Sequence, residues 1–450
     1  MKTEETTRQS AVSQIKNLIE SRSEQEIQNL LDELKPQDIA DVLESSPPAQ
    51  RTMLWELFDE SHQREIIQHI DEDVVPSLLG DKSGEQIATV LEQTDDDDTA
   101  DILQRLPADL IQEVLEAMDA QDRSRVENLL AYPEDTAGGM MDTDTISVRP
   151  QVSLDVVLRY LRRHAELPSM TDSIFVVNST DEFVGVLPLA TLLVSNPTLT
   201  VEEIMVTQIE AIPADMSEHD VAAKFERYDL VSAPVIDQDN RLLGRITIDD
   251  VVDVIIDEAD HSILGMAGLN EDSDIFAPIV KTAKSRAIWL GANLITAFIA
   301  ASVIDIFKDT IEKVVALAVL MPIVASMGGV AGSQTLTLII RNMAQDELFS
   351  NNLAWLTRRE VAVGAINGCL WACVVAVATS ILFNDMRLGL IIAAALVINL
   401  LTAALSGALL PNFLRSIGID PAIAGTVVLT TITDVVGFLS FLGLATLFYA

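Results

Sequence analysis

Residues 430–438 read "TTITDVVGF" and place one carboxylate, Asp434, inside the last apolar stretch of the chain. No other charged side chain occurs in residues 421–450. An ionised acid that faces lipid is costly, so acids inside membrane segments usually face a pore or pair with a base. The stretch therefore predicts a membrane-spanning helix that carries a functional polar site.

The residues around Asp434 supply hydroxyl groups. Thr430, Thr431 and Thr433 flank it, and Thr426 lies two turns earlier on nearly the same face of a helix. Carboxylate, hydroxyl and backbone oxygens suit a hard cation, in particular Mg²⁺ that keeps much of its water shell. No lysine or arginine lies within the apolar parts of the membrane segments, so a salt bridge does not explain Asp434. A protonated Asp434 that takes part in a proton relay is the alternative. We predict that Asp434 holds a conducted ion.

Four further apolar stretches precede this one, and each is long enough to cross a hydrocarbon layer of about 30 Å. The five stretches cover residues 286–306, 314–340, 360–383, 388–410 and 422–449, within a domain at 283–450. The polar segments on the same side of the membrane as the N-terminus contain seven basic residues beside the apolar stretches, and the loops on the other side contain three. This asymmetry predicts a multi-pass membrane protein with a cytoplasmic N-terminus and the C-terminus on the opposite side.

The second stretch contains "MPIVASMGGVAGSQTLTLIIR", residues 321–341. Proline and clustered glycines weaken a helix in lipid, and they are tolerated beside protein or a wet cavity. Close packing of helices through small residues is the alternative interpretation. The polar residues that follow the glycines favour a lumen. The predicted ion pathway consists of Asp434, Thr426, Thr430, Gly328, Gly329, Gln334 and Asp420.

The charge of the chain is concentrated before the membrane segments. Residues 284–450 contain nine acidic and nine basic residues, so the net charge of −39 resides in residues 1–283. A surface this negative repels nucleic acid and attracts divalent cations, although it also serves solubility. We expect no nucleic-acid partner.

Two soluble regions precede the membrane domain. Residues 1–135 contain similar helical units, such as "DIADVLESSPP" and "TADILQRLPAD", and predict an acidic, all-α superhelical domain. Residues 136–200 and 201–256 each show a strand, a polar turn and a second strand with a glycine, alternating with amphipathic helices. This duplication resembles a pair of cystathionine-β-synthase-type (CBS) modules. The fold class is a multidomain membrane protein with tandem α/β domains and a five-helix transmembrane domain.

Acidic side chains are densest in two runs, residues 95–101 and 249–260. Two such surfaces repel one another unless cations lie between them, so Mg²⁺ would bring them together. The alternative is that each run is a solvated helix face. The predicted metal ligands, besides Asp434, are Asp97, Asp98, Asp101, Asp250, Asp253, Asp257, Glu258 and Asp260.

Three motifs together resemble the MgtE family of bacterial magnesium channels. They are "YPEDTAGGMM" at 132–141, the glycine-rich segment at 321–341 and "GIDPAIAGTVVLTTITDVVGFLSF" at 418–441. The resemblance implies a homodimer with its pore on the two-fold axis, a filter aspartate at Asp434 and cytosolic domains that sense Mg²⁺. It also implies a connecting plug helix at 257–282 and a location in the bacterial cytoplasmic (inner) membrane.

The chain departs from the family pattern at three places. Val330 stands where the family commonly has asparagine after two glycines, and Thr426 stands where a relative can carry asparagine. After Glu258 and Ala259 the family often continues with Thr-Glu-Asp, whereas this chain continues with Asp-His-Ser. Ligands in these regions therefore do not transfer directly.

No motif of an enzyme is present. The sequence lacks a Walker loop, zinc-ligand spacing of histidines, a nucleophile elbow and HExxH, so we expect neither catalysis nor ATP-driven pumping. Thr247 and Asp250 match a weak ribose-binding pattern for ATP at the CBS pair, but the same residues also make an ordinary helix start.

We predict a Mg²⁺-selective channel for influx that is gated closed by intracellular Mg²⁺. Transport of other divalent cations such as Co²⁺ or Mn²⁺ is one alternative, and a non-conducting membrane sensor of metal or nucleotide is another.

Overall fold

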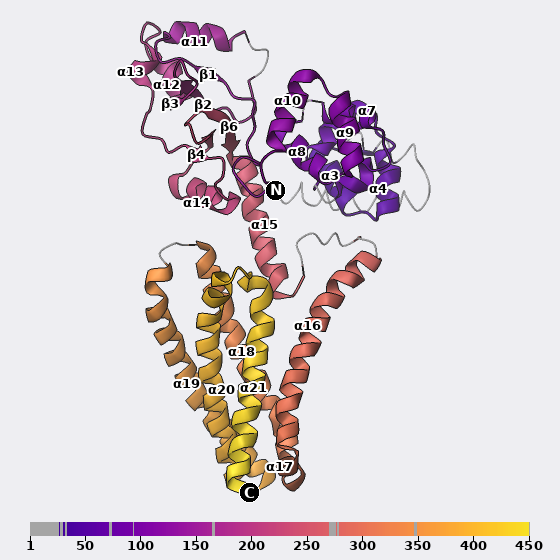
Figure 1. Ribbon diagram of the computed structural model, residues 1–450, viewed down its shortest axis with the longest axis vertical. Helices are drawn as coiled ribbons and strands as arrows, with labels where there is room; N and C mark the ends of the chain where they lie inside the picture. The colour runs from indigo at the N-terminus through magenta and orange to yellow at the C-terminus, as the bar shows by residue number, and fades with distance from the viewer. Residues whose placement is uncertain are drawn as a thin grey trace. The chain divides into compact units, whose positions relative to one another are not determined.

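The computed structural model describes residues 27, 30–31, 34–71, 74–92, 94–163, 167–269, 276, 279–345 and 349–449. The chain divides into two compact units, Met1–Ile256 with Asp274–Ala277 and Asp257–Ser273 with Pro278–Ala450. Figure 1 shows the elements of each unit, which are described separately below.

Short helices build the first part of unit 1, as the repeats predict. Prolines at the first helical position start two of them, and Ser83 closes a capping box with Gln86 at the start of a third. Leu43, Leu54 and Trp55 are fully buried among the helices. Residues 1–26 of the predicted domain lie outside the described residues. The described helices are α3 (Pro36–Glu44), α4 (Pro48–Trp55), α5 (Glu60–Ile67), α6 (Val75–Leu79), α7 (Gly84–Leu91), α8 (Asp96–Gln104), α9 (Ala108–Ala117) and α10 (Ala120–Leu129).

The motif at 132–141 joins this helical domain to the second CBS module. Ala137 and Gly138 donate backbone hydrogen bonds to the carbonyls of Met216 and Ala214, at 2.8 and 2.9 Å. A Cβ on Gly139 would lie 2.6 Å from the carbonyl oxygen of Pro133, so only glycine fits the close backbone approach there. The motif is therefore a tight backbone junction.

Two three-stranded sheets confirm the duplication. In each sheet the first strand pairs in parallel with the second, and the second pairs antiparallel with the third. Both hairpins also carry a register shift at the same place, after Val176 and after Val235. The strands are β1 (Ser147–Val148), β2 (Ser173–Val177), β3 (Phe183–Pro188), β4 (Ile212–Pro213), β5 (Ser232–Ile236) and β6 (Leu242–Thr247). The accompanying helices are α11 (Leu154–Leu161), α12 (Leu189–Val194), α13 (Val201–Ile204) and α14 (Glu218–Tyr228).

One long helix, α15 (Ile248–Met266), follows β6 without a break at residue 257. It ends where Gly268 adopts a φ of +71° and Leu269 donates its N–H to the carbonyl of Leu264. Of the rest of the predicted plug segment, residues 270–275 and 277–278 lie outside the described residues, and residues 279–282 belong to α16 (Ile279–Ile306).

The second unit contains the membrane helices. Within the described part of the chain, five helical segments are long and apolar enough to cross a membrane: Thr282–Ile306, Ala316–Met343, Asn352–Phe383, Met386–Ser416 and Pro421–Tyr449. The helices are α16 (Ile279–Ile306), α17 (Lys308–Lys313), α18 (Ala316–Gln345), α19 (Phe349–Phe383), α20 (Met386–Ser416) and α21 (Pro421–Tyr449). The helix α19 begins at residue 349, before the apolar stretch predicted at 360–383, because its more polar first turns are also helical. It therefore brings Arg358, Arg359 and Glu360 into a membrane-length segment.

Glycines set the contacts of α18 with its neighbours. Cβ atoms built on Gly332 and Gly425 would lie 3.0 Å from Leu429 and 3.2 Å from Leu336, which shows that α18 and α21 run antiparallel. A Cβ on Gly407 of α20 would lie 2.8 Å from the carbonyl oxygen of Gly332. Small residues thus let α18 approach both α20 and α21 closely, and Figure 1 shows these helices side by side.

Candidate functional site

Asp434 lies half-buried in the middle of α21 and makes no ion pair with any described residue. The hydroxyl of Thr430 donates to the carbonyl of Thr426 at 3.0 Å, and that of Thr433 donates to the carbonyl of Thr430 at 3.0 Å. Each hydroxyl oxygen keeps acceptor capacity while its proton is held by the helix backbone. The segment therefore offers oxygen atoms beside an acid that no basic side chain neutralises.

An open hollow lies along one face of α18. Gly329 and Gln334, both predicted for the ion pathway, line it. Val330 projects into the same hollow and is 57% exposed. A Cβ on Gly329 would lie 4.0 Å from the methyl carbon of Thr430, so this face of α18 adjoins the threonines of α21. The remaining lining residues are Ser326, Ser333 and Thr337.

Gly328 does not line this hollow with the other predicted pathway residues. A Cβ added to Gly328 would overlap the side-chain amide of Asn399, which comes from α20. Gly328 thus faces the interior of the helix bundle, and its neighbour Gly329 faces the hollow.

Asp420 lies at the start of α21, apart from the middle of the helix. Its Oδ1 accepts a hydrogen bond from the backbone N–H of Ala422 at 2.6 Å. Its Oδ2 lies 2.5 Å from Nε2 of His261, a residue of α15. This contact was not predicted, and it joins α15 to the start of α21.

A second acid is buried in the membrane unit. Glu360 of α19 pairs through Oε1 with Nη1 of Arg359 at 2.7 Å, and its Oε2 lies 3.4 Å from the hydroxyl of Thr335. Glu360 therefore has a basic partner, whereas Asp434 has no ion-pair partner among the described residues.

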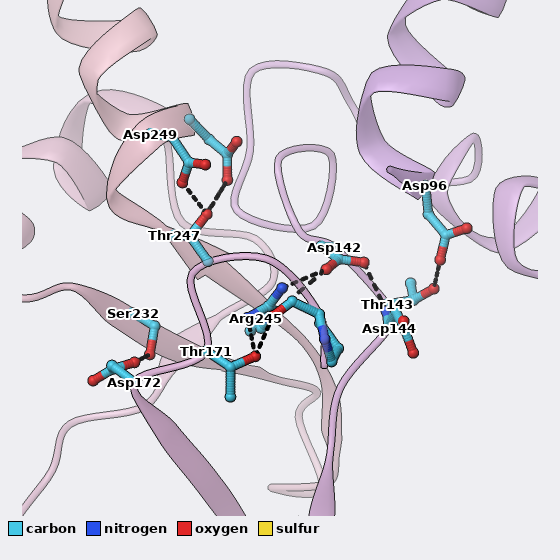
Figure 2. Close-up of polar contacts among 12 residues, drawn as sticks. Asp96, Asp142, Thr143, Asp144, Thr171, Asp172, Ser232, Arg245, Thr247 and Asp249 are labelled. Carbon is cyan, nitrogen blue, oxygen red and sulfur yellow. Dashed lines mark hydrogen bonds and ion pairs between the residues drawn. The ribbon is translucent and has the colours of Figure 1, made fainter. Parts of the chain in front are cut away.

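The acidic run at 95–101 forms the N-terminal end of α8. Asp96, Asp97 and Asp98 occupy the first turn, where the helix dipole favours negative charge. The hydroxyl of Thr143 donates to Asp96, as Figure 2 shows. Arg125 lies 3.9 Å from the same carboxylate. Asp97 is 5% exposed, and its Oδ1 has no hydrogen-bond partner among the described residues.

Asp97 and Asp250 both lie where an ionised carboxylate is costly. Burial, followed by the charge of Asp250, raises the pKa of Asp97 well above its usual range. Burial, followed by the charge of Asp249, raises the pKa of Asp250 to about 7. Both shifts mean that the carboxylates lack enough positive charge nearby. A buried carboxylate oxygen without a partner fits a hard cation such as Mg²⁺.

The other predicted ligands are spread along two helices. Asp98 and Asp101 lie half-buried on α8, whereas Asp253, Asp257, Glu258 and Asp260 are exposed on α15. Asp253, Asp257 and Asp260 share one face of α15, because they are spaced by four and three residues. Among the described residues no group of three or more His, Cys, Asp or Glu side chains forms a ready metal centre.

Thr247 and Asp250 meet at the start of α15. The hydroxyl of Thr247 donates to Asp250 at 3.0 Å and also to Asp249 (Figure 2). The backbone N–H of Thr247 lies 3.3 Å from the same oxygen of Asp250. These bonds are those of a helix start, which was the alternative interpretation of this pair.

A buried ion pair lies beside this acidic region and was not predicted. Asp142 accepts hydrogen bonds from Nε and Nη2 of Arg245, at 3.2 and 3.0 Å, and both side chains are buried. Figure 2 shows the pair between Thr171 and Asp144. The arginine follows Gly244 in β6, and only the folded chain reveals that this strand faces residue 142.

Family models match most of the chain. The model described as "Divalent cation transporter" matches residues 321–444, and that of the "MgtE intracellular N domain" matches residues 34–135. The CBS domain model matches residues 137–195 and 201–257.

Two known magnesium transporters are similar to this chain over most of its length, and one solved structure is similar over about half of it. The chain is 32% identical to the magnesium transporter MgtE of Thermus thermophilus, over 78% of this chain and 79% of that protein. It is 28% identical to the magnesium transporter MgtE of Bacillus subtilis, over 89% of this chain and 92% of that protein. A solved structure of the cytosolic domain of the Mg²⁺ channel MgtE in complex with ATP is 29% identical, with a TM-score of 0.49, and covers 54% of this chain and 99% of that one.

Proposed function

Since the chain belongs to the MgtE family of magnesium transporters and so carries Mg²⁺ across a membrane, we propose that it is a Mg²⁺-selective channel for influx. Intracellular Mg²⁺ closes it by binding to the acidic cytosolic residues. The observation that carries the proposal is Asp434, a half-buried acid within a membrane-length helix that has no ion-pair partner in the described chain.

The pathway consists of oxygen atoms on α21 and the polar face of α18. Asp434 would supply the charge that attracts the ion, and Thr430, one helical turn before it, adjoins Gly329, which lines the hollow together with Gln334. Mg²⁺ is small and loses its water shell reluctantly, so a site with one carboxylate and several neutral oxygens suits a hydrated ion. Asp420 stands at the entrance of α21 and can attract cations there.

A second copy of the chain would enclose the pathway. The hollow on α18 is open along its length, and Val330 is exposed within it. A two-fold partner seated on this face would cover Val330 and place two copies of Asp434 around one axis. The N-terminus would lie in the bacterial cytoplasm and the C-terminus on the opposite side of the membrane, as the distribution of basic residues favours.

Closure would come from Mg²⁺ at the acidic surfaces. Burial raises the cost of ionising both Asp97 and Asp250, and the charge of Asp250 adds to that cost at Asp97, so a cation held near them would reduce it. The remaining ligands would be Asp98, Asp101, Asp253, Asp257, Glu258 and Asp260. The binding is weak for each residue, so the set acts together. ATP is a further proposed ligand, held by Thr247 and Asp250, and a fluorescent ATP analogue that binds Thr247→Ala as well as wild type would exclude this pair.

Flux into liposomes tests the proposal. The full-length protein, without ATP, should let Mg²⁺ enter down its gradient, and Asp434→Ala should abolish entry while the protein still assembles. Asp309→Ala, a change of an acid outside the five membrane segments, is the matched control and should conduct as wild type does. Uptake by Asp434→Ala at the wild-type rate would remove Asp434 from the pathway.

The same liposomes decide between the alternatives. Competition by Co²⁺ or Mn²⁺ at equal concentration would indicate a broader divalent transporter, and absence of any flux at every Mg²⁺ concentration would indicate a sensor. Single-channel recording while Mg²⁺ on the cytosolic side is raised into the millimolar range should show the open probability falling.

A further inference from the structure

Asn399 is a polar residue in the middle of α20, where the surrounding sequence is apolar. It is completely buried. Its Nδ2 donates a hydrogen bond to the backbone carbonyl of Val324 on α18, at 2.8 Å. Its Oδ1 is buried and has no hydrogen-bond partner among the described residues. A buried amide that is only partly satisfied is costly, so its position needs a reason beyond packing.

The amide fills a space left by two glycines on different helices. A Cβ on Gly437 of α21 would lie 2.9 Å from Nδ2 of Asn399, and one on Gly328 of α18 would overlap the same amide. Asn399 therefore contacts α18 and α21 at once. No other residue type at positions 328 and 437 leaves room for it.

This contact lies level with Asp434. The helices α18 and α21 run antiparallel, with Gly437 against Val324 and Gly329 against Thr430. Asp434 lies between Thr430 and Gly437 in the sequence, so the segment of α18 at the same height is the one that contains Gly328. Asn399 donates a hydrogen bond to the carbonyl of Val324 in this segment and contacts Gly328.

We propose that Asn399 is a positioning residue, which fixes the spacing of α18 and α21 at the height of Asp434 and thereby sets the preference for Mg²⁺ over other divalent cations. The inference rests on the proposed role of Asp434. Mg²⁺ requires near-ideal octahedral geometry, so a small change in the spacing of the oxygen atoms changes which cation fits. Residues behind a metal site affect it in this way by orienting the groups that touch the ion.

The first experiment measures Mg²⁺ and Co²⁺ uptake by full-length protein in liposomes. Asn399→Leu keeps the number and branching of the side-chain heavy atoms and removes the hydrogen bond. We expect Mg²⁺ uptake to fall about tenfold or more, with a lower ratio of Mg²⁺ to Co²⁺ uptake and an unchanged elution profile. Asn367→Leu is the matched control, because Asn367 is exposed on α19, and it should keep the wild-type rate and ratio.

The second experiment tests the contact with Gly328. Gly328→Ala should lose uptake, because the new methyl group meets the amide of Asn399. The double variant Gly328→Ala with Asn399→Ala removes the obstacle and should recover more uptake than Gly328→Ala alone. If Asn399→Leu does not yield assembled protein, the double variant decides the matter, because it lacks Asn399 and should therefore show a lower ratio of Mg²⁺ to Co²⁺ uptake than wild type.

Two results would overturn the inference: wild-type uptake and ion ratio in Asn399→Leu, or a wild-type ratio of Mg²⁺ to Co²⁺ uptake in the double variant. Asp434→Ala, measured in parallel, separates this failure from failure of the proposed function. If Asp434→Ala conducts as wild type does, the premise about Asp434 is wrong. If it does not conduct while Asn399→Leu is normal, only the role of Asn399 is wrong.

Discussion

Asp142 and Arg245 show what a buried ion pair contributes at the scale of single residues. Burial raises the pKa of Asp142 even though Arg245 and the backbone N–H of Asp144 lower it. Desolvation therefore outweighs attraction, so the pair adds little net stability compared with two apolar side chains. Its role is specificity, because it fixes residue 142 against β6, where the two backbones also exchange hydrogen bonds of 2.8 and 2.9 Å.

Replacing Asp142 with alanine should be strongly destabilising, because it leaves the guanidinium of Arg245 buried without its carboxylate. We expect a loss of about 3–5 kcal/mol in the local stability of β6. Hydrogen exchange of the β6 amides in the full-length protein measures this loss. Glu210→Gln, which breaks an exposed pair with Lys224, should leave the same amides protected. Equal protection of β6 in Asp142→Ala and wild type would contradict the prediction.

At the scale of elements, the close approach of α18 and α20 depends on glycine. Gly407 faces the backbone of α18, and a Cβ there would lie 2.8 Å from the carbonyl oxygen of Gly332 and 2.9 Å from Cβ of Thr335. Backbone atoms cannot move aside as a flexible side chain can. The glycine-rich segment at 321–341 therefore serves packing as well as the hollow, and both interpretations of its sequence apply to different glycines.

Gly407→Ala should push α18 away from α20. We expect a loss of stability of about 1–3 kcal/mol from overpacking, together with reduced Mg²⁺ uptake. Stability is measured by heating the detergent-solubilised protein and then running size-exclusion chromatography. The melting temperature is the temperature at which half of the monodisperse peak is lost. Gly291→Ala in α16 is the control, because nothing lies within 4 Å of a Cβ at that position. A melting temperature that falls equally in both variants would show that the loss does not come from the contact with α18.

At the scale of the whole molecule, the negative charge of residues 1–283 is not uniformly solvated. Asp97 and Asp250 are held in places where burial raises the pKa of each carboxyl. Asp250 has an ordinary pKa of 3.8 and a pKa of about 7 in the folded protein. Its contribution to stability is therefore fully present below about pH 4 and is lost as the pH rises through about 7.

Without Mg²⁺, the protection of the α8 amides should weaken between pH 6 and pH 8, because the charge of Asp250 acts on Asp97 of α8. Millimolar Mg²⁺ should restore it more at pH 8 than at pH 6, because protons compete with the cation at the lower pH. Hydrogen exchange of the α8 amides at both pH values, with and without Mg²⁺, measures this. Asp97→Asn should flatten both dependences, and a pH response unchanged by this substitution would mean that other groups control it.

The sequence predicted much of the architecture and less of the site. The two hairpins, the short N-terminal helices and five membrane-length helices follow from local periodicity, which a single sequence contains. Thr430 and Gly329 were expected in one pathway, and the structure brings them together. Gly328 was grouped with Gly329, but adjacent helical positions point in different directions, and Gly328 meets Asn399 instead.

By itself, the sequence determined the fold class, the separation of an acidic region from an apolar one and the unusual position of Asp434, because composition and periodicity act locally. Only the tertiary structure decided that Asn399 lies between Gly328 and Gly437, that Asp142 meets Arg245 and that Asp97 lies near Asp250. Each of these contacts joins residues far apart in the chain. Their geometry follows from how whole helices and strands pack, which no short stretch of sequence specifies.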